Sequence, residues 1–328
     1  MRSKRSSRNC TATRAGAPYR SPINSRDVRI TAWGASAVAI LSLISGGATA
    51  DPPPNPESLQ QSASNSGNSG FDTVTIEARK QRELMEHQIS TFVSSITIPS
   101  REESLARWQL PICPLVAGLP RDRGEFVFRR VSQVARDAGI PLAPQECAPN
   151  FLIIMTRQPE VLLNKLWARN PRLMNDDRGI GGIKSFIHTA QPVRVWYNAC
   201  SEAAGWAKTF REGSLHCGTG ALGSRLTWEA VRAIYSAIVV VDLGHIKDLN
   251  DGQLADYIAM IGFAQIRKNP KLGVAPTILR LFAESDVARP QGLSSWDQAF
   301  LKSLYGEDSG NVMQLTAIKF RMDRDLVP

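Results

Sequence analysis

Apolar residues recur at helical spacing in two segments of the first half of the chain. They predict amphipathic helices over residues 78–95 and 123–138, with Pro99 ending the first and Gly139 following the second. The two apolar stripes consist of Met85, Ile89, Phe92, Val93 and Ile96, and of Val127, Val131, Val134, Ala135 and Ala138. A short β-prone piece, residues 73–76, precedes the first helix. Each helix therefore has one face to bury against the rest of the fold.

Strand signals alternate with these helices. Residues 151–155 and 237–241 are continuous apolar runs, typical of strands buried on both faces, whereas residues 192–197 alternate between apolar and polar. The proline-rich segment 108–118 is compatible with a short edge strand, where proline is tolerated. Pro159 opens a helix soon after the first apolar run. This order of helix, apolar strand and helix indicates an α/β layer.

The chain after residue 250 is mostly helical. Apolar spacing predicts three helices, over residues 251–267, 277–283 and 311–321. A further helix begins after Ser294, which with Asp297 has the Ser-x-x-acid spacing of an N-terminal cap, and Gly306 ends that helix at Tyr305.

These elements predict one folded domain after a linker. Residues 51–71 are mostly proline, serine, asparagine and glycine, a composition that predicts a disordered linker. No internal repeat is found after it. We interpret residues 72–328 as a single α+β domain, with a small mixed sheet, packed helices and a helical C-terminal half.

The first 50 residues have the pattern of a secretory signal peptide. Basic residues dominate positions 1–30, an uncharged run covers positions 31–45, and small residues lead to Ala50. We expect cleavage after Ala50 and export across the inner membrane to the periplasm or beyond. The alternative is an uncleaved anchor, but an apolar core of about fifteen residues is shorter than the ~20 that span a bilayer. No stable membrane anchor is therefore expected after cleavage.

The formal net charge of +9 belongs mostly to this leader. Eight of the 39 basic residues lie in the first 50 positions, against one of the 30 acidic residues, which leaves a net charge of +2 beyond them. A nearly neutral chain has no long-range attraction for nucleic acid or anionic lipid. We therefore expect no nucleic-acid partner, and the composition does not indicate any other partner.

Four cysteines remain after the leader: Cys113, Cys147, Cys200 and Cys217. An even number in an exported protein indicates two disulfides, and sequence proximity favours Cys113–Cys147 and Cys200–Cys217 among the three possible pairings. A catalytic or metal-binding thiol is the alternative, although no C-x-x-C spacing supports it. Disulfide pairing is consistent with the export that the leader predicts.

A glycine cluster in residues 179–185 has some features of a phosphate-binding loop. It lacks the Gly-Lys-Ser/Thr order, and no apolar strand directly precedes it. We interpret residues 175–182, with the Asp176 and Asp177 pair, as a solvated loop. The G-x-S-x-G turn of serine hydrolases is also absent, so a serine nucleophile of that kind has no support.

Asp242 and His245 directly follow the apolar run over residues 237–241. The carboxyl ends of strands are where α/β sheets place functional groups, so these two residues are candidates for catalysis. Gln253 and Asp256 of the next helix complete the candidate set. The alternative is a polar strand end without a function. Because no complete catalytic set, cofactor fingerprint or metal-ligand spacing is found, neither a cofactor nor a metal is expected.

The other histidines give weaker signals. His87 falls on a charged helix face and is expected to be solvated, while the spacing around His188 fits either a buried or a surface position. His216 adjoins Cys217, but a disulfide at Cys217 would remove the thiolate that a Cys/His site needs.

The C-terminal half resembles the end of secreted zincin-like domains of unknown function from Gram-negative bacteria. The resemblance covers residues 225–306 and rests on the apolar strand, the following helix, a short Ile-Phe segment and the Leu293-Ser294-Ser295-Trp296-Asp297 to Leu304-Tyr305 helix. Zincins need two His four apart and a Glu on one helix, and the corresponding helix reads Gln253-Leu254-Ala255-Asp256-Tyr257. The resemblance to zincin-like domains therefore implies a scaffold without zinc hydrolysis. The whole chain also resembles uncharacterised exported proteins of alphaproteobacteria.

Three functional hypotheses follow. The first is an exported, non-enzymatic protein with a binding or envelope role, on a zincin-like scaffold that has lost its metal. The second is a secreted hydrolase with its site around the end of the 237–241 strand and the 251–267 helix. The third is an interaction surface of exposed aromatic residues, for which the candidates are Trp196, Trp206 and Trp228.

Overall fold

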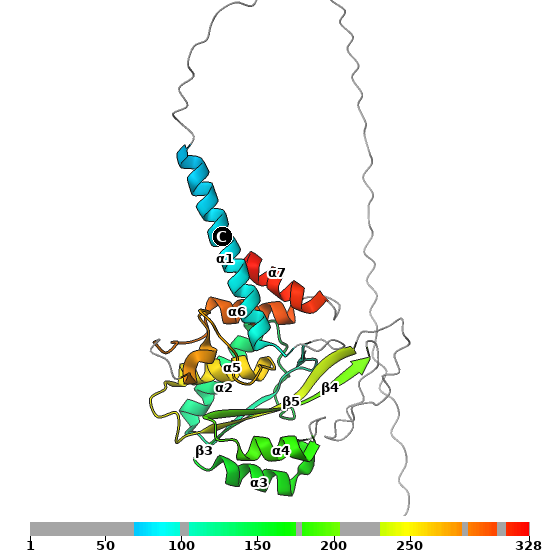
Figure 1. Cartoon of the computed structure of the whole chain (residues 1–328). Coiled ribbons are helices and arrows are strands. Elements are labelled where there is room, and N and C mark those ends of the chain that lie inside the picture. Colours follow the sequence, from blue (N-terminus) through cyan, green and yellow to red (C-terminus); the bar gives the residue numbers. More distant parts are fainter. Residues whose placement is uncertain are drawn as a thin grey trace, which may run out of the picture. The chain divides into compact units, whose positions relative to one another are not determined.

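The computed structural model describes residues 69–98, 105–174, 179–203, 230–283, 288–306 and 313–327. Over this part of the chain, helices pack on both faces of a five-stranded mixed sheet (Figure 1). The expected α+β class is confirmed. The leader and residues 51–68 and 204–229 lie outside the described residues, and with them lie His216, Cys217, Trp206 and Trp228.

Strand β5 (Ala230–Asp242) is the centre of the sheet. The short β1 (Arg107–Trp108) and β3 (Phe151–Thr156) pair with it in parallel at successive positions along one side. Strand β2 (Pro114–Ala117) continues the sheet in parallel beyond β3. Strand β4 (Val193–Ala203) pairs with the other side of β5, antiparallel. Strands β2 and β4 are therefore the two edges of the sheet as far as it is described.

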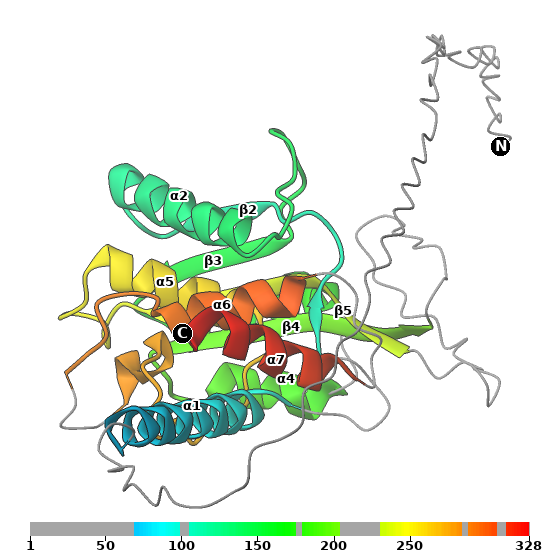
Figure 2. The same ribbon diagram turned by 90° about the horizontal axis from the view of Figure 1, so that it is seen from above.

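Five helices cover one face of the sheet: α1 (Ser69–Ile96), α2 (Arg121–Asp137), α5 (Asp251–Phe263), α6 (Ser295–Tyr305) and α7 (Gln314–Leu326). Helices α3 (Pro159–Arg169) and α4 (Gly179–His188) cover the other face. Figure 2 shows α1 and α2 at opposite margins of the first layer, with α5, α6 and α7 between them. The sheet is thus enclosed between two helical layers, which explains why its central strands are apolar throughout.

Alternate residues of β3 enter different cores. Phe151, Ile153 and Met155 belong to the large core under α1, α2, α5, α6 and α7. Leu152 and Ile154 pack instead against the smaller core under α3 and α4. The ring of Phe151 lies 5.7 Å from that of Trp108 and 5.6 Å from that of Phe263. This aromatic cluster joins β1, β3 and α5.

The helix ends follow the expected local signals. Gly139, at φ +79°, closes α2 in a left-handed conformation, and the N–H of Ile140 returns to the carbonyl of Ala135 at 2.8 Å. Pro159 is at the first turn of α3. Ser294 and Asp297 form a reciprocal capping box at the start of α6. The predicted helices over residues 78–95, 123–138 and 294–305 are confirmed.

Five expected elements differ from the structure. Residues 73–76 belong to α1 and form no strand, and α5 ends at Phe263 because Ala264 is extended. The segment over residues 277–283 is a 3₁₀ helix, η2 (Ile278–Phe282), and the final helix runs further, to Leu326. Residues 175–178 of the expected loop, with Asp176 and Asp177, lie outside the described residues. The rest of that loop is helical from Gly179, because packing of the Phe186 ring on Trp196 outweighs the low helix propensity of glycine.

The expected Cys113–Cys147 disulfide is present, with Cα atoms 6.1 Å apart. It fixes the start of β2 to the turn before β3, where the Cys113 carbonyl also accepts the N–H of Phe151 at 3.2 Å. The expected Cys200–Cys217 pair lies outside the residues whose side chains are described. Within the described part, no helix has both the length and the hydropathy to cross a bilayer.

Candidate functional site

Asp242 and His245 meet at the carboxyl end of β5. The Asp242 carboxylate accepts the N–H of Gly244 at 2.8 Å and lies 3.0 Å from His245 Nδ1. The Asp242 side chain is 14% exposed and the imidazole of His245 is 62% exposed. The two candidates predicted at this strand end therefore form one His–carboxylate pair, held by a turn and open to solvent.

A second His–carboxylate pair lies between α3 and α4. His188 Nδ1 is 2.9 Å from Glu160 Oε1, and more than half of each side chain is exposed. Burial lowers the pKa of Arg194, and the charges of Asp242 and Glu160 act on its guanidinium and partly oppose that shift. Arg194 thus lies within electrostatic range of both pairs. The groove that lies along β4 is lined by none of these four acid and histidine residues.

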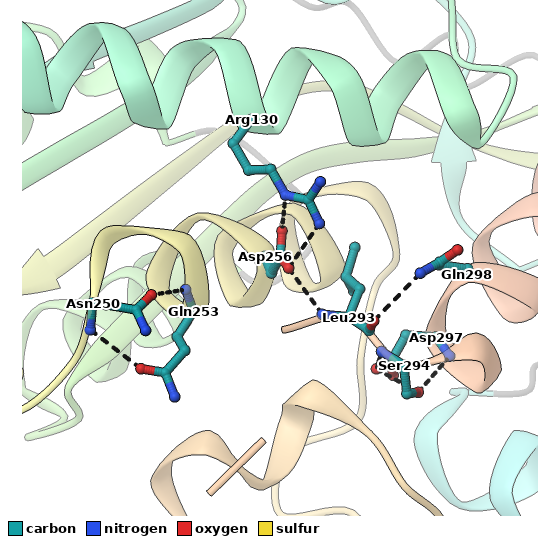
Figure 3. A network of polar contacts seen from close by, with 8 residues as sticks. All are labelled: Arg130, Asn250, Gln253, Asp256, Leu293, Ser294, Asp297 and Gln298. Carbon is teal, nitrogen blue, oxygen red and sulfur yellow. Dashed lines mark hydrogen bonds and ion pairs between the residues drawn. The ribbon is translucent and has the colours of Figure 1, made fainter. Parts of the chain in front are cut away.

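Gln253 has a structural role at the start of α5 (Figure 3). Its N–H donates to Asn250 Oδ1 at 2.8 Å, and its Oε1 accepts the N–H of Asn250 at 3.2 Å. Its Nε2 donates to the carbonyl of Pro290 at 2.8 Å. These bonds form a capping box and attach α5 to the segment before α6, so both the oxygen and the nitrogen of this side-chain amide are engaged in structural contacts.

Asp256 is also occupied by structural contacts (Figure 3). Arg130 of α2 donates to both carboxylate oxygens, with Nε–Oδ1 at 2.5 Å and Nη2–Oδ2 at 2.9 Å. The N–H of Leu293 donates to Oδ2 at 2.9 Å. The Asp256 side chain is only 4% exposed. Asp256 and Gln253 therefore hold α2, α5 and the chain before α6 together, through contacts separate from those of Asp242 and His245.

The residues of α5 do not fit a zinc ion. Gln253 and Tyr257 are four residues apart on this helix, and residues 251–267 include no histidine. Across the described residues, no three His, Cys, Asp or Glu side chains are grouped so that they could hold a metal ion. The zinc chemistry of zincins thus has no ligand set in this part of the chain.

A groove of about 500 Å³ runs along the outer edge of β4. We call it the β4 groove and define it by Val193, Val195 and Tyr197 of β4, Phe186 of α4, Tyr257 of α5 and Phe282 of η2. Helix α4 forms one wall, and α5, η2 and residues 265–272 form the other. The sequence pattern did not indicate this groove, because its walls come from four separate segments.

The backbone N–H and C=O groups of successive β4 residues point alternately toward β5 and toward the outer edge. The N–H of Asp242 donates to the carbonyl of Pro192 at 2.8 Å, and from this pair the ladder continues through Arg194 opposite Val240. In an antiparallel ladder, every second residue directs its N–H and C=O away from the partner strand. Val193 and Val195 are these residues, and Tyr197 continues the series. Their backbone groups therefore point into the β4 groove.

Tyr257 places a hydroxyl group in the wall of the groove. Its ring packs edge-on against Phe282, with centroids 4.8 Å apart. Among the described residues its hydroxyl has no hydrogen-bond partner, and burial raises the pKa of Tyr257 to about 12. The phenol is therefore protonated near neutral pH and can donate a hydrogen bond to a ligand.

No protein-family model, curated protein or solved structure matches this chain. The function must therefore be argued from the geometry of the site itself.

The histidine and tryptophan residues that the sequence singled out differ in their exposure. His87 is exposed, as expected, and His188 also proves to be a surface residue. Trp196 is completely buried against Phe186, so it contributes to no exposed aromatic surface. The alternation over residues 192–197 was the one sequence signal that pointed to β4. It does not show which edge of a strand lacks a partner.

Proposed function

We propose that this chain is an exported, non-enzymatic protein that binds an extended peptide by strand addition at β4. The observation that carries the proposal is the row of backbone N–H and C=O groups of Val193 and Val195, which face a groove and no described strand. An extended peptide satisfies such groups with its own backbone, and its alternate side chains contact the two walls.

The chemistry of the groove favours a peptide over an apolar ligand. The walls are largely apolar, with Phe186, Ile261 and Phe282 among the lining residues. An apolar ligand that covered β4 would separate its N–H and C=O groups from water without replacing their hydrogen bonds, at a cost of about 1–3 kcal/mol for each group. A peptide covers the same apolar area and restores those bonds.

The leader and the disulfide support the export part of the proposal. Residues 1–50 have the order of a secretory signal, and Cys113–Cys147 is of the kind that persists in an oxidising compartment. N-terminal sequencing of the protein from the periplasm or medium is expected to begin at Asp51. Recovery of the chain only in the cytosol, with Met1 retained, would contradict export.

A proposal about the scaffold follows from the order of elements after β4. A buried strand leads to α5, where Gln253 and Tyr257 occupy positions four apart, as the two histidines of a zincin do. We propose that the fold is zincin-like and keeps a peptide groove without a metal.

Val195 offers a direct test of strand addition. Because its N–H points away from β5, Val195→Pro removes one donor from the groove and leaves the β4–β5 ladder intact. The probe is the fluorescein-labelled peptide acetyl-Thr-Val-Gln-Val-Gln-Val-Thr, and binding to the purified full chain is measured by fluorescence anisotropy. We expect Val195→Pro to weaken binding about tenfold. The matched control Val195→Ala keeps the N–H and is expected to lose less than threefold.

Modified peptides test the same point on the unaltered protein. Two versions of the probe carry N-methyl groups on its odd or its even backbone amides, and strand addition uses only one of these sets. We expect one version to bind as the parent peptide does and the other to lose binding. Equal binding of both versions would contradict strand addition, even if Val195→Pro did not fold.

One observation favours a second candidate, a hydrolase at the end of β5. His245 Nδ1 lies 3.0 Å from a carboxylate oxygen of Asp242, and a carboxylate beside an imidazole can orient it for proton transfer. Under this hypothesis the protein cleaves a quenched fluorescent peptide, and His245→Ala abolishes the cleavage. Under the binding proposal, the same peptide is bound and recovered intact.

A further inference from the structure

Three cations line the β4 groove, and no carboxylate accompanies them among its described lining residues. They are Arg194, Arg267 and Lys268. Arg267 donates from Nε and Nη2 to the carbonyl of Thr97, at 3.1 and 2.9 Å, so its partner is a neutral group. Arg194 donates from Nη1 to the carbonyl of Ile187 at 2.6 Å. No ion pair within 4 Å neutralises any of the three in the described part of the chain.

Arg194 also has hydrogen-bonding capacity that the described residues do not use. Its side chain is buried, with 8% of the residue exposed, and its Nε has no partner. An unpaired charged donor in such a position carries a desolvation cost, which the negative charge of a ligand in the groove would offset. The two carboxylates that act on it from further away, Asp242 and Glu160, are already engaged by His245 and His188.

The neutral groups along the groove add further donors. The hydroxyl of Tyr257 has no acceptor among the described residues, and the backbone N–H groups of Val193 and Val195 point into the same space. A ligand carboxylate is the group that accepts from arginine, lysine and phenol donors together, and charge-assisted bonds of this type are the strongest available. The groove therefore complements negative charge.

We infer that the peptide bound along β4 is acidic, with Asp or Glu side chains that contact Arg194, Lys268 and the Tyr257 hydroxyl. This inference rests on the proposed peptide-binding function. It assigns the charge class of the partner, an extended segment of an acidic protein. A basic or neutral segment would leave three groove cations without compensation.

Three matched peptides test this assignment. They share the sequence acetyl-Thr-Val-Xaa-Val-Xaa-Val-Thr, in which both Xaa residues are Glu, Gln or Lys. We expect the Glu peptide to bind the full chain about tenfold more tightly than the Gln peptide, and the Lys peptide to bind weakest. The preference should decrease as sodium chloride is raised from roughly 20 mM to roughly 500 mM, because the Debye length shortens and the salt screens the exposed part of the attraction.

Two substitutions connect the preference to the groove. Lys268→Gln removes a lining cation, and Lys271→Gln removes an exposed cation of the same segment that does not line the groove. We expect the first to weaken the Glu peptide about threefold to fivefold without changing the Gln peptide, and the second to change neither. Tyr257→Phe retains the ring contact with Phe282 and is expected to reduce the preference for Glu over Gln.

The possible outcomes separate this inference from the proposed function. If the Glu, Gln and Lys peptides bind equally and Val195→Pro weakens all three, strand addition stands and the acidic assignment is wrong. If none of the three peptides binds, both are wrong. If decanoate displaces the Glu peptide and binds Val195→Pro as well as the parent protein, the occupant is an anionic lipid, which also overturns the inference.

Discussion

Arg130 and Asp256 join α2 to α5 through two parallel hydrogen bonds, of 2.5 and 2.9 Å. The carboxylate is almost completely buried, whereas 37% of the Arg130 side chain is exposed. The pair also supports the chain before α6, because the N–H of Leu293 donates to the same carboxylate. Arg123 and Asp251 form a second ion pair between the same helices, but its carboxylate is 23% exposed, so Arg130–Asp256 is the more buried link.

Removal of Asp256 should therefore destabilise the fold. We expect Asp256→Ala to lower the free energy of unfolding by about 2–3 kcal/mol, a value reduced from the range for fully buried pairs because Arg130 is partly solvated. Urea denaturation gives this quantity. Glu125→Ala, which breaks an exposed pair with Arg121, is the control and should leave the free energy of unfolding almost unchanged. A similar loss in both variants would contradict a special role for Asp256.

The buried carboxyl of Asp297 should make stability depend on pH. Burial raises its pKa, although donors from Thr277, Ile278 and Ser294 oppose that shift. A carboxyl with a raised pKa in the folded state binds its proton more tightly there than in the unfolded chain, where the pKa is about 3.9. Its stabilising contribution is therefore complete below that value and is lost as pH rises through the folded-state pKa.

Asp297→Asn tests this dependence, because an amide does not titrate. The variant should be less stable than the parent protein at low pH, and the difference in unfolding free energy should decrease as pH rises through this window. Urea titrations at several pH values measure it. A difference that is constant with pH would show that Asp297 has the same affinity for protons in both states.

The Cys113–Cys147 disulfide should contribute a large share of stability. It closes a loop with a sequence separation of 34 residues. In the chain-entropy model such a loop corresponds to about 3–4 kcal/mol. We expect the double variant Cys113→Ser/Cys147→Ser to lose this amount in denaturant unfolding. Peptide mapping without reductant checks the pairing, and it also tests the predicted Cys200–Cys217 bond.

Gly262 allows α5 to approach β3 closely. A Cβ at this position would lie 2.3 Å from Cζ of Phe151, which is itself fixed between Trp108 and Phe263. We expect Gly262→Ala to destabilise the protein by about 2–3 kcal/mol. Gly181→Ala in α4 is the control: nothing lies within 4 Å of that Cβ, so the variant should be neutral or more stable by up to about 1 kcal/mol.

The sequence predicted the parts of the fold that local patterns determine. Gly139, Pro159 and the Ser294–Asp297 cap signal helix ends within a few residues, and β3 was visible as an apolar run. The start of α4 was not predicted, because its glycines become helical only when Phe186 packs against Trp196. Helix α5 ends early for a similar reason, since the hydroxyl of Tyr197 bonds to the carbonyl of Ile261.

The candidate site was predictable only in part. Asp242 and His245 are three residues apart, so a turn after β5 was enough to bring them together. Asp256 bonds to Arg130, 126 residues away, and the side chain of Gln253 bonds to Pro290, 37 residues away. No local pattern distinguishes such a structural carboxylate from a catalytic one. The β4 groove depends on which strand neighbours β5, and that pairing is a property of the assembled sheet.

The walls on either side of β4 also affect how copies of this protein meet in a crowded compartment. An open sheet edge normally invites another folded molecule to dock and extend the sheet, which is the first step toward insoluble aggregates. Here α4 and η2 stand on the two sides of that edge. Walls of this kind restrict the approach of a second folded copy more than that of a single extended strand. The walls described beside β4 therefore oppose edge-to-edge association of two copies and leave room for the proposed peptide.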